Sequence, residues 1–291
     1  MTTDPHAFAS LAAEQIIKGL GITTLPIDPI AIARGRGIEV EAKPTSSAGV
    51  SGMLVRVGNE FAIVYGTHLQ NEGFQNYSVG HELGHYFLPG HVDAVIKGDS
   101  GFHESRAGFT SKDRYEMEAD RFAAGFLMPR HLFFPALERA GKGVAAVESL
   151  ATLCKTSLHA TAIRYAQCTR DMVAVIVSVG NQIDHCFMSD SLKQVSDIEW
   201  LKKRGAVPRG TPTHGFNQDA SNVQRGVRIE ETSKLQQWFG GSRHIEISED
   251  VIGLGRYGKT LSVLYDINVP DTEEEEDEAA LIESWTPRIR R

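Results

Sequence analysis

The chain has 291 residues, of which 41% are hydrophobic and 23% charged, as is typical of a folded globular protein. Its formal net charge is −7, but three of the 30 basic and eight of the 37 acidic side chains lie in residues 271–291. Composition and charge exclude a collagen, a coiled coil and a wholly disordered chain. They also exclude the strong overall positive field of many nucleic-acid-binding proteins.

The sequence predicts a cytoplasmic protein without a membrane segment. Its longest apolar run, residues 172–177, is far shorter than the ~20 residues that a bilayer span requires. Residues 1–21 carry Asp4, Glu14 and Lys18 among their apolar side chains, so they lack the core of a signal peptide. Three cysteines are a sparse and odd set, which fits a reducing compartment.

The first part of the chain predicts mostly helices, because its apolar residues recur at helical spacing. The predicted elements are helices at 8–20 and 26–37, strands at 51–57 and 61–65, helices at 76–88 and 113–128, and two short helices within 147–167. A polar loop is expected at 92–111, since this stretch shows neither helical nor strand periodicity.

The second part of the chain is expected to be rich in strands. Its predicted strands are 172–179, 185–189, 244–248 and 260–266, with a Gly- and Pro-rich loop at 205–226. The change of character near residue 168 predicts a domain boundary there, and the fold class is therefore α+β.

Residues 81–85 are His-Glu-Leu-Gly-His and fall within the helix predicted over 76–88. His81 and His85 are four residues apart, so both rings lie on one face of the helix and can reach a single metal ion. Glu82 stands beside the first of these histidines, where it can take a proton from a metal-bound water. The pattern predicts a catalytic zinc site with Glu82 as the general base.

A catalytic zinc site needs a third protein ligand, and the sequence offers three candidates. Glu116 and Asp120 share one face of a helix, so Glu116 can bind the metal while Asp120 accepts a hydrogen bond from a ligand histidine. His91 has the spacing of the third histidine in metzincins, but Leu88 stands where those enzymes need a glycine. Glu118 is expected on the other side of the helix. We favour Glu116 and keep His91 and Glu118 as alternatives.

The segment HELGHYFLPGH, followed by EMEADRFAAGFLMP, resembles the paired motifs of the ImmA/IrrE family of zinc metallopeptidases. The resemblance covers roughly residues 8–168. It implies a zincin-like core of helices with a small β-sheet, in which His81, His85 and Glu116 bind the metal and Glu82 is the general base. It also implies a substrate, a helix-turn-helix repressor cut at one site, so that stress-response, mobile-element or phage-defence genes are released.

The same resemblance suggests how the rest of the chain is organised. Residues 149–165 look like the helix-turn-helix segment that follows the peptidase core in this family. With few charged side chains around them, a structural role is expected rather than DNA contact. Residues 169–270 occupy the place of a GAF-like sensory domain in IrrE-type proteins.

Four parts are therefore expected along the chain. They are a zincin-like metallopeptidase domain (1–130), a helix-turn-helix-like helical segment (131–168), an α/β sensory or regulatory domain (169–270) and an acidic, disordered tail (271–291).

Basic and aromatic residues in the third part offer a site for an activator. A single-stranded nucleic acid or a small molecule would bind if these side chains gathered on one face. The basic residues are Lys202, Lys203, Arg204, Arg209, Arg225, Arg228, Arg243, Arg256 and Lys259, and the aromatic ones are Trp200, Phe216, Trp238 and Phe239. We favour the plainer interpretation of scattered surface cations and core aromatic residues.

Peptide hydrolysis needs a second donor, besides the metal, for the negative charge on the scissile oxygen. The candidates for this role or for substrate contact are His91, His103, Arg106 and Tyr115. The strands predicted over 51–57 or 61–65 are expected to pair with an extended substrate.

Two histidines and one carboxylate suit Zn²⁺, and they also suit Mn²⁺ or Fe²⁺. The alternative function is a non-cleaving metal-binding partner that sequesters a repressor or an antitoxin. A third is a DNA-binding regulator. An intact Glu82 argues against both, since neither needs a base beside the metal. The sequence holds no pattern that sets the oligomeric state.

Overall fold

The computed structural model describes residues 7–44, 50–68, 71–96, 101–106, 113–241 and 244–269. The predicted acidic tail, Arg243 and the side chain of Arg106 lie outside the described residues. The chain divides into two compact units, Met1–Thr169 and Arg170–Arg291. Each unit combines helices with one β-sheet, so the predicted α+β class is confirmed.

The first unit contains eight helices and a four-stranded sheet within the described residues. Its elements are α1 (Ala7–Gly19), α2 (Pro29–Gly35), β1 (Glu39–Lys43), β2 (Val50–Val57), β3 (Glu60–Gly66), α3 (Glu72–Phe87), α4 (His91–Val95), β4 (Phe102–Arg106), α5 (Arg114–Leu127), α6 (Arg130–Ala140), α7 (Gly143–Cys154) and α8 (Leu158–Cys168). The strand order is β1-β3-β2-β4, with β1 parallel to β3 and the other pairs antiparallel.

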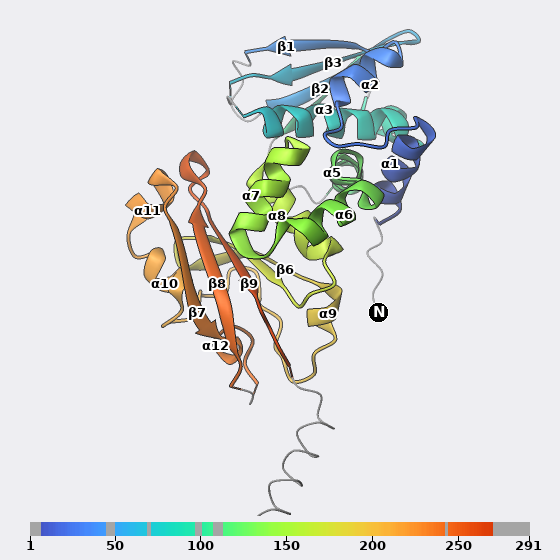
Figure 1. The fold of residues 1–291 in the computed structure, drawn as a ribbon. Helices are drawn as coiled ribbons and strands as arrows, with labels where there is room; N and C mark the ends of the chain where they lie inside the picture. The colour runs from blue at the N-terminus through green and yellow to red at the C-terminus, as the bar shows by residue number, and fades with distance from the viewer. Residues whose placement is uncertain are drawn as a thin grey trace, which may run out of the picture. The chain divides into compact units, whose positions relative to one another are not determined.

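Helix α3 lies between the sheet on one side and α5 on the other (Figure 1). It begins earlier than predicted because the Asn71 side chain caps it, accepting a hydrogen bond from the Phe74 N–H at 3.0 Å. Asp113 caps α5 in the same way. Since α3 is covered on two sides, polar residues on it are buried with the apolar ones.

Small residues allow α3 and α5 to approach closely. A Cβ atom on Gly84 would lie 3.0 Å from Ala119 Cα, and one on Gly80 would lie 3.5 Å from Ala123 Cβ. Gly80 and Gly84 are one turn apart, as are Ala119 and Ala123, so these pairs form a seam along the two helices. The seam brings the acidic residues of α5 opposite the histidines of α3.

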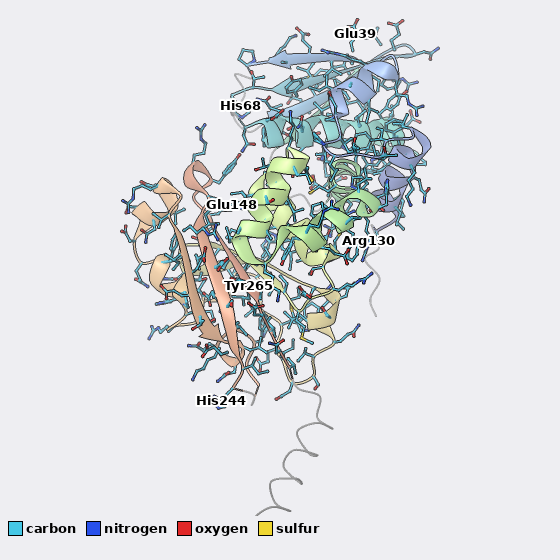
Figure 2. All side chains as sticks on the ribbon, viewed as in Figure 1. Glu39, His68, Arg130, Glu148, His244 and Tyr265 are labelled. Atoms are coloured by element: carbon cyan, nitrogen blue, oxygen red, sulfur yellow. The ribbon has the colours of Figure 1, made fainter. Side chains whose placement is uncertain are left out.

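The expectation that the strands at 51–57 or 61–65 pair with a substrate is wrong. β2 is hydrogen-bonded to both β3 and β4, and β3 is hydrogen-bonded to both β1 and β2. Their backbone groups are already paired within the sheet, so neither strand has a free edge. The outer strands of the described sheet are β1, whose first residue Glu39 is labelled in Figure 2, and β4.

The second unit is built on a five-stranded antiparallel sheet of order β6-β5-β9-β8-β7. Its elements are β5 (Ala174–Val179), β6 (Gln182–Met188), α9 (Asp190–Lys193), α10 (Pro212–Phe216), α11 (Ala220–Arg225), β7 (Arg228–Lys234), α12 (Leu235–Phe239), β8 (Glu246–Gly253), η2 (Gly255–Tyr257) and β9 (Thr260–Tyr265). The last strand, β9, which ends at Tyr265 (labelled in Figure 2), lies in the middle of this sheet.

The aromatic residues of the second unit do not form an exposed stacking surface. Trp238 and Phe239 on α12 are buried in a cluster with residues of β5 and β9, and Phe216 on α10 is buried in a second cluster against β8. Among the four aromatic residues singled out in the sequence, Trp200 alone is exposed, at 62%. For three of the four aromatic residues, this outcome agrees with the plainer of the two interpretations.

Several elements escape the sequence prediction, most of them because they are short or polar. They are β1, β4 and β7 at the sheet edges, the short helices α4, α9, α10, α11 and α12, and α6, which carries Pro135 in its interior. An edge strand needs no regular alternation of apolar residues, since its side chains are largely exposed. The loops predicted at 92–111 and 205–226 therefore each contain regular structure. Among the described residues, no helix is long and apolar enough to cross a membrane.

A buried ion pair ties α1 to α8. Arg164 Nη2 lies 2.6 Å from Glu14 Oε1, and both residues are less than a tenth exposed. Arg164 also donates from Nε to the Met128 carbonyl at 2.9 Å. The pair therefore joins three separate parts of the first unit.

Glu14→Ala is expected to lower the free energy of unfolding by about 3–5 kcal/mol, because it leaves a buried guanidinium unpaired. Denaturant unfolding followed by far-ultraviolet circular dichroism measures this. The control is Glu72→Ala, which removes an exposed ion pair with Lys155 and should have a much smaller effect. An equally small loss of free energy of unfolding in both variants would show that the buried pair does not stabilise the unit.

Candidate metal centre

His81, His85 and Glu116 converge on one point between α3 and α5. The two histidine Nε2 atoms are 3.1 Å apart, Glu116 Oε2 lies 3.3 Å from His81 Nε2, and Glu116 Oε1 lies 3.3 Å from His85 Nε2. These three form the one group of its kind among the described residues, with the potential ligand atoms all within 4.8 Å of one another.

This donor set fits a divalent metal ion. Ligand atoms at the usual zinc distances lie about 3.3 Å apart around a tetrahedral ion, and the observed separations match that value. Two imidazoles and one carboxylate would leave a further coordination position for water, as in catalytic rather than structural zinc sites.

Asp120 orients the first histidine of the group. Its Oδ1 lies 2.9 Å from His81 Nδ1 and accepts a hydrogen bond from the Tyr77 hydroxyl at 3.2 Å. A hydrogen on His81 Nδ1 is held by the carboxylate, so the lone pair of Nε2 faces the other two ligand atoms. Asp120 thus occupies the position that the sequence suggested for it, and Tyr77 is an additional partner one turn before His81.

The electrostatics of the cluster favour positive charge at its centre. Burial disfavours a charged His81, but hydrogen bonds with Asp120 and Glu116 outweigh it and raise the His81 pKa to about 10. Burial lowers the pKa of His85 to about 3. Burial would raise the pKa of Glu116, but hydrogen bonds from His103, His81 and His85 hold it well below its usual range. A bound cation would replace the proton on His81.

Glu82 is fully buried beside this group. Neither of its carboxylate oxygens has a hydrogen-bond partner of acceptable geometry among the described residues. Burial raises its pKa to about 7, against the opposing effects of the His81 charge and of the nearby Ser105 hydroxyl. A Cβ atom on Gly52 of β2 would lie only 2.5 Å from Glu82 Oε1, so any larger residue there would displace the carboxylate. Glu82 can therefore hold or release a proton near neutral pH.

His91 and Glu118, the alternative third ligands, pair with each other outside the three-residue group. His91 Nε2 lies 2.9 Å from Glu118 Oε2, and His91 Nδ1 lies 3.3 Å from His85 Nδ1. Burial lowers the pKa of His91. Glu118 does lie on another side of α5 from Glu116, but it faces α4 and is buried, contrary to what a solvated helix charge would show.

The remaining candidate contacts are spread around the cluster. His103 on β4 is half-buried, and its Nε2 lies 2.9 Å from Glu116 Oε1. The Tyr115 ring packs edge-on against the ring of His91 at 5.0 Å. Gly52 and Tyr77 are not predicted as site residues from the sequence. Tyr77 could have been found one helical turn before His81, but Gly52 has no local signal.

We expect the purified chain to bind one Zn²⁺ per molecule, and His81→Ala or Glu116→Ala to weaken binding by more than about 100-fold, since each removes a ligand. Isothermal titration calorimetry on the full chain measures this. Glu60→Ala, which removes an exposed carboxylate of the same unit, should bind as the wild type does. Unchanged affinity in Glu116→Ala would exclude Glu116 as a ligand.

Part of this chain is similar to a known family of domains. The IrrE N-terminal-like domain of peptidase family M78 matches residues 33–165, which include every residue of the cluster. No curated protein matches the chain. A Mycobacterium tuberculosis transcriptional regulator of known structure has a similar fold, with a TM-score of 0.56 and 14% sequence identity. The similarity covers 89% of this chain and 76% of that one.

The match begins within α2 and ends within α8, so it spans the sheet, both helices that carry the cluster and most of the first unit. It agrees with the resemblance stated from the two sequence motifs. Residues 33–165 of this chain therefore match the IrrE N-terminal-like domain, as the resemblance to the ImmA/IrrE family implied.

Proposed function

We propose that this protein is a zinc-dependent endopeptidase that cuts a helix-turn-helix transcriptional repressor at one site. The observation that carries the proposal is a fully buried carboxylate, Glu82, which makes no hydrogen bond of acceptable geometry among the described residues and lies beside three convergent ligand residues. A purely structural metal site would have no use for such a base, and leaving a buried carboxylate without partners costs stability.

Each residue of the cluster has a distinct role in the proposed reaction. His81, His85 and Glu116 would hold the metal, which when bound would polarise the scissile carbonyl and acidify a water molecule. Glu82 takes a proton from the attacking water and passes it to the leaving amine, and a pKa near 7 suits both steps. His103, whose imidazole reaches Glu116, is our candidate donor to the developing oxyanion.

The outer edge of β4 is the proposed docking site for the substrate backbone. No described strand pairs with that edge, and β4 carries His103 to the cluster. An extended peptide added there would hydrogen-bond through its main chain, and side-chain pockets would supply selectivity. This assignment replaces the interior strands that the sequence suggested.

A role in transcription regulation is supported by the peptidase domain and by the similar fold of a protein named as a transcriptional regulator. We propose that cleavage releases genes of the DNA-damage or stress response, or of mobile elements or phage defence. The helix-turn-helix character of α7 and α8, the sensory role of the second unit and the cytoplasmic location stay predictions. The choice of zinc over Mn²⁺ or Fe²⁺ is also part of the proposal.

We expect Glu82→Gln to reduce cleavage by at least about 100-fold while zinc binding remains, because the substitution removes the base and retains the ligands. The measurement is co-expression with the helix-turn-helix repressor encoded beside the gene, with and without DNA damage, followed by mass spectrometry of the repressor. Glu72→Gln, an exposed acid on the same helix, is the control and should cleave normally.

A discrete fragment that appears only when Glu82 is intact would support a site-specific peptidase. Stable co-purification of the two intact proteins under every condition would instead support a non-cleaving partner that sequesters the repressor.

Gly52→Ala is expected to lower cleavage by about 10–100-fold while zinc affinity stays close to that of the wild type. The new methyl group would push the Glu82 carboxylate from its position, and a shift of about 1 Å can cost that much. Cleavage rate and zinc affinity are compared in the same preparation. Normal cleavage by this variant would contradict the role given to the position of Glu82.

A further inference from the structure

A chain of buried polar residues extends from His85 away from the ligand group. His85 Nδ1 lies 3.3 Å from His91 Nδ1, His91 Nε2 lies 2.9 Å from Glu118 Oε2, and Arg114 donates from Nε to Glu118 Oε1 at 2.6 Å. His85 is fully buried, His91 is 1% exposed and Glu118 is 2% exposed. Of the four, only Arg114 reaches solvent.

Backbone geometry brings His91 back over the end of α3. Gly90 adopts a left-handed conformation, with φ of +78°, immediately before α4. The His91 N–H donates to the Leu88 carbonyl at 3.2 Å, which closes a tight turn after α3. Gly90 tolerates this conformation because it has no Cβ atom. The turn sets the imidazole of His91 against that of His85.

The direction of each hydrogen bond follows from the ligand geometry. His85 Nε2 faces Glu116 and His81, so with a metal ion bound its lone pair would be the one offered to the ion, and the ring hydrogen would then be on Nδ1. His85 Nδ1 must then donate to His91 Nδ1. His91 in turn carries its hydrogen on Nε2 and donates it to the Glu118 carboxylate.

This arrangement mirrors that of the other ligand histidine. His81 donates directly to Asp120, whereas a second carboxylate of the same helix reaches His85 only through His91. Burying Glu118 is costly unless its charge is paired, and Arg114 and His91 together meet that cost. Metal binding by His81, His85 and Glu116 would not by itself require a buried charge at Glu118.

We propose that His91 and Glu118 are positioning residues, which fix the tautomer and the ring orientation of His85 for metal binding. The inference rests on the proposed metal site and gives a role to the two residues that the sequence offered as ligands. Hydrogen-bond partners of ligand histidines commonly change metal affinity by about 10–100-fold.

The test measures zinc affinity of the full chain by competition with a chelating indicator. His91→Phe keeps a ring of similar size but removes the acceptor, and should weaken binding by about 10–100-fold. His91→Asn places an amide oxygen near the position of Nδ1, so it should retain affinity within a few-fold. Glu118→Gln keeps the shape but removes the charge, and should weaken binding by about tenfold.

Glu14→Gln is the matched control, since Glu14 is also a buried glutamate whose carboxylate lies 2.6 Å from an arginine nitrogen. It should lower the melting temperature but leave zinc affinity unchanged. The absorption spectrum of the Co²⁺-loaded chain provides a second readout. We expect His91→Phe to alter its visible bands, which report ligand geometry, and His91→Asn to resemble the wild type.

Wild-type zinc affinity in both His91→Phe and Glu118→Gln would overturn the proposed role of the pair and leave the metal site standing. Equal weakening in His91→Phe and His91→Asn would overturn the hydrogen-bond explanation. If the wild type bound no ion, or His81→Ala bound zinc as tightly, the metal site itself would be wrong. Circular dichroism of each variant checks folding, and Glu118→Gln decides the question if His91→Phe does not fold.

Discussion

The close approach of α3 and α5 is the constraint on which the candidate site depends. Because Gly84 has no side chain, α3 can lie against Ala119 at a distance that a Cβ atom would barely allow. At that separation, side chains one turn apart on each helix meet their counterparts on the other. His81 and His85 therefore meet Glu116, and Asp120 meets His81 from behind. A wider separation would leave the same residues as unrelated polar groups on two helices.

Two buried carboxylates of this protein differ in their hydrogen bonding, and the difference distinguishes a structural role from a catalytic one. Glu249 in the second unit is fully buried and accepts hydrogen bonds from Thr213, Ser233 and Trp238, so its polar atoms are satisfied and it holds α10 and α12 to the sheet. Glu82 is equally buried but makes no hydrogen bond of acceptable geometry in the described part of the chain. A group left unsatisfied at that cost is the natural place to expect proton transfer.

Helix α5 carries three acidic residues two positions apart, and the fold gives each a different environment. Glu116 and Asp120 both face His81 on α3, whereas Glu118 faces α4 and the His91 ring. A single helix thus places a carboxylate behind each ligand histidine. Asp120 contacts His81 directly, and Glu118 reaches His85 through His91. This explains why an acidic helix is largely buried: each charge is matched by an imidazole or a guanidinium rather than by water.

Helical spacing in the sequence by itself determined the histidine pair, its adjacent base and the pairing of Glu116 with Asp120, because residues four apart on a helix share a face whatever surrounds them. The same reasoning predicted the α+β class and the main helices. It could not tell that β2 and β3 are interior strands, that β9 lies in the centre of its sheet, or that Gly52 makes room for Glu82. It also could not show that His91 and Glu118 face each other. These relations join segments far apart in the chain, and only tertiary packing decides which of them meet.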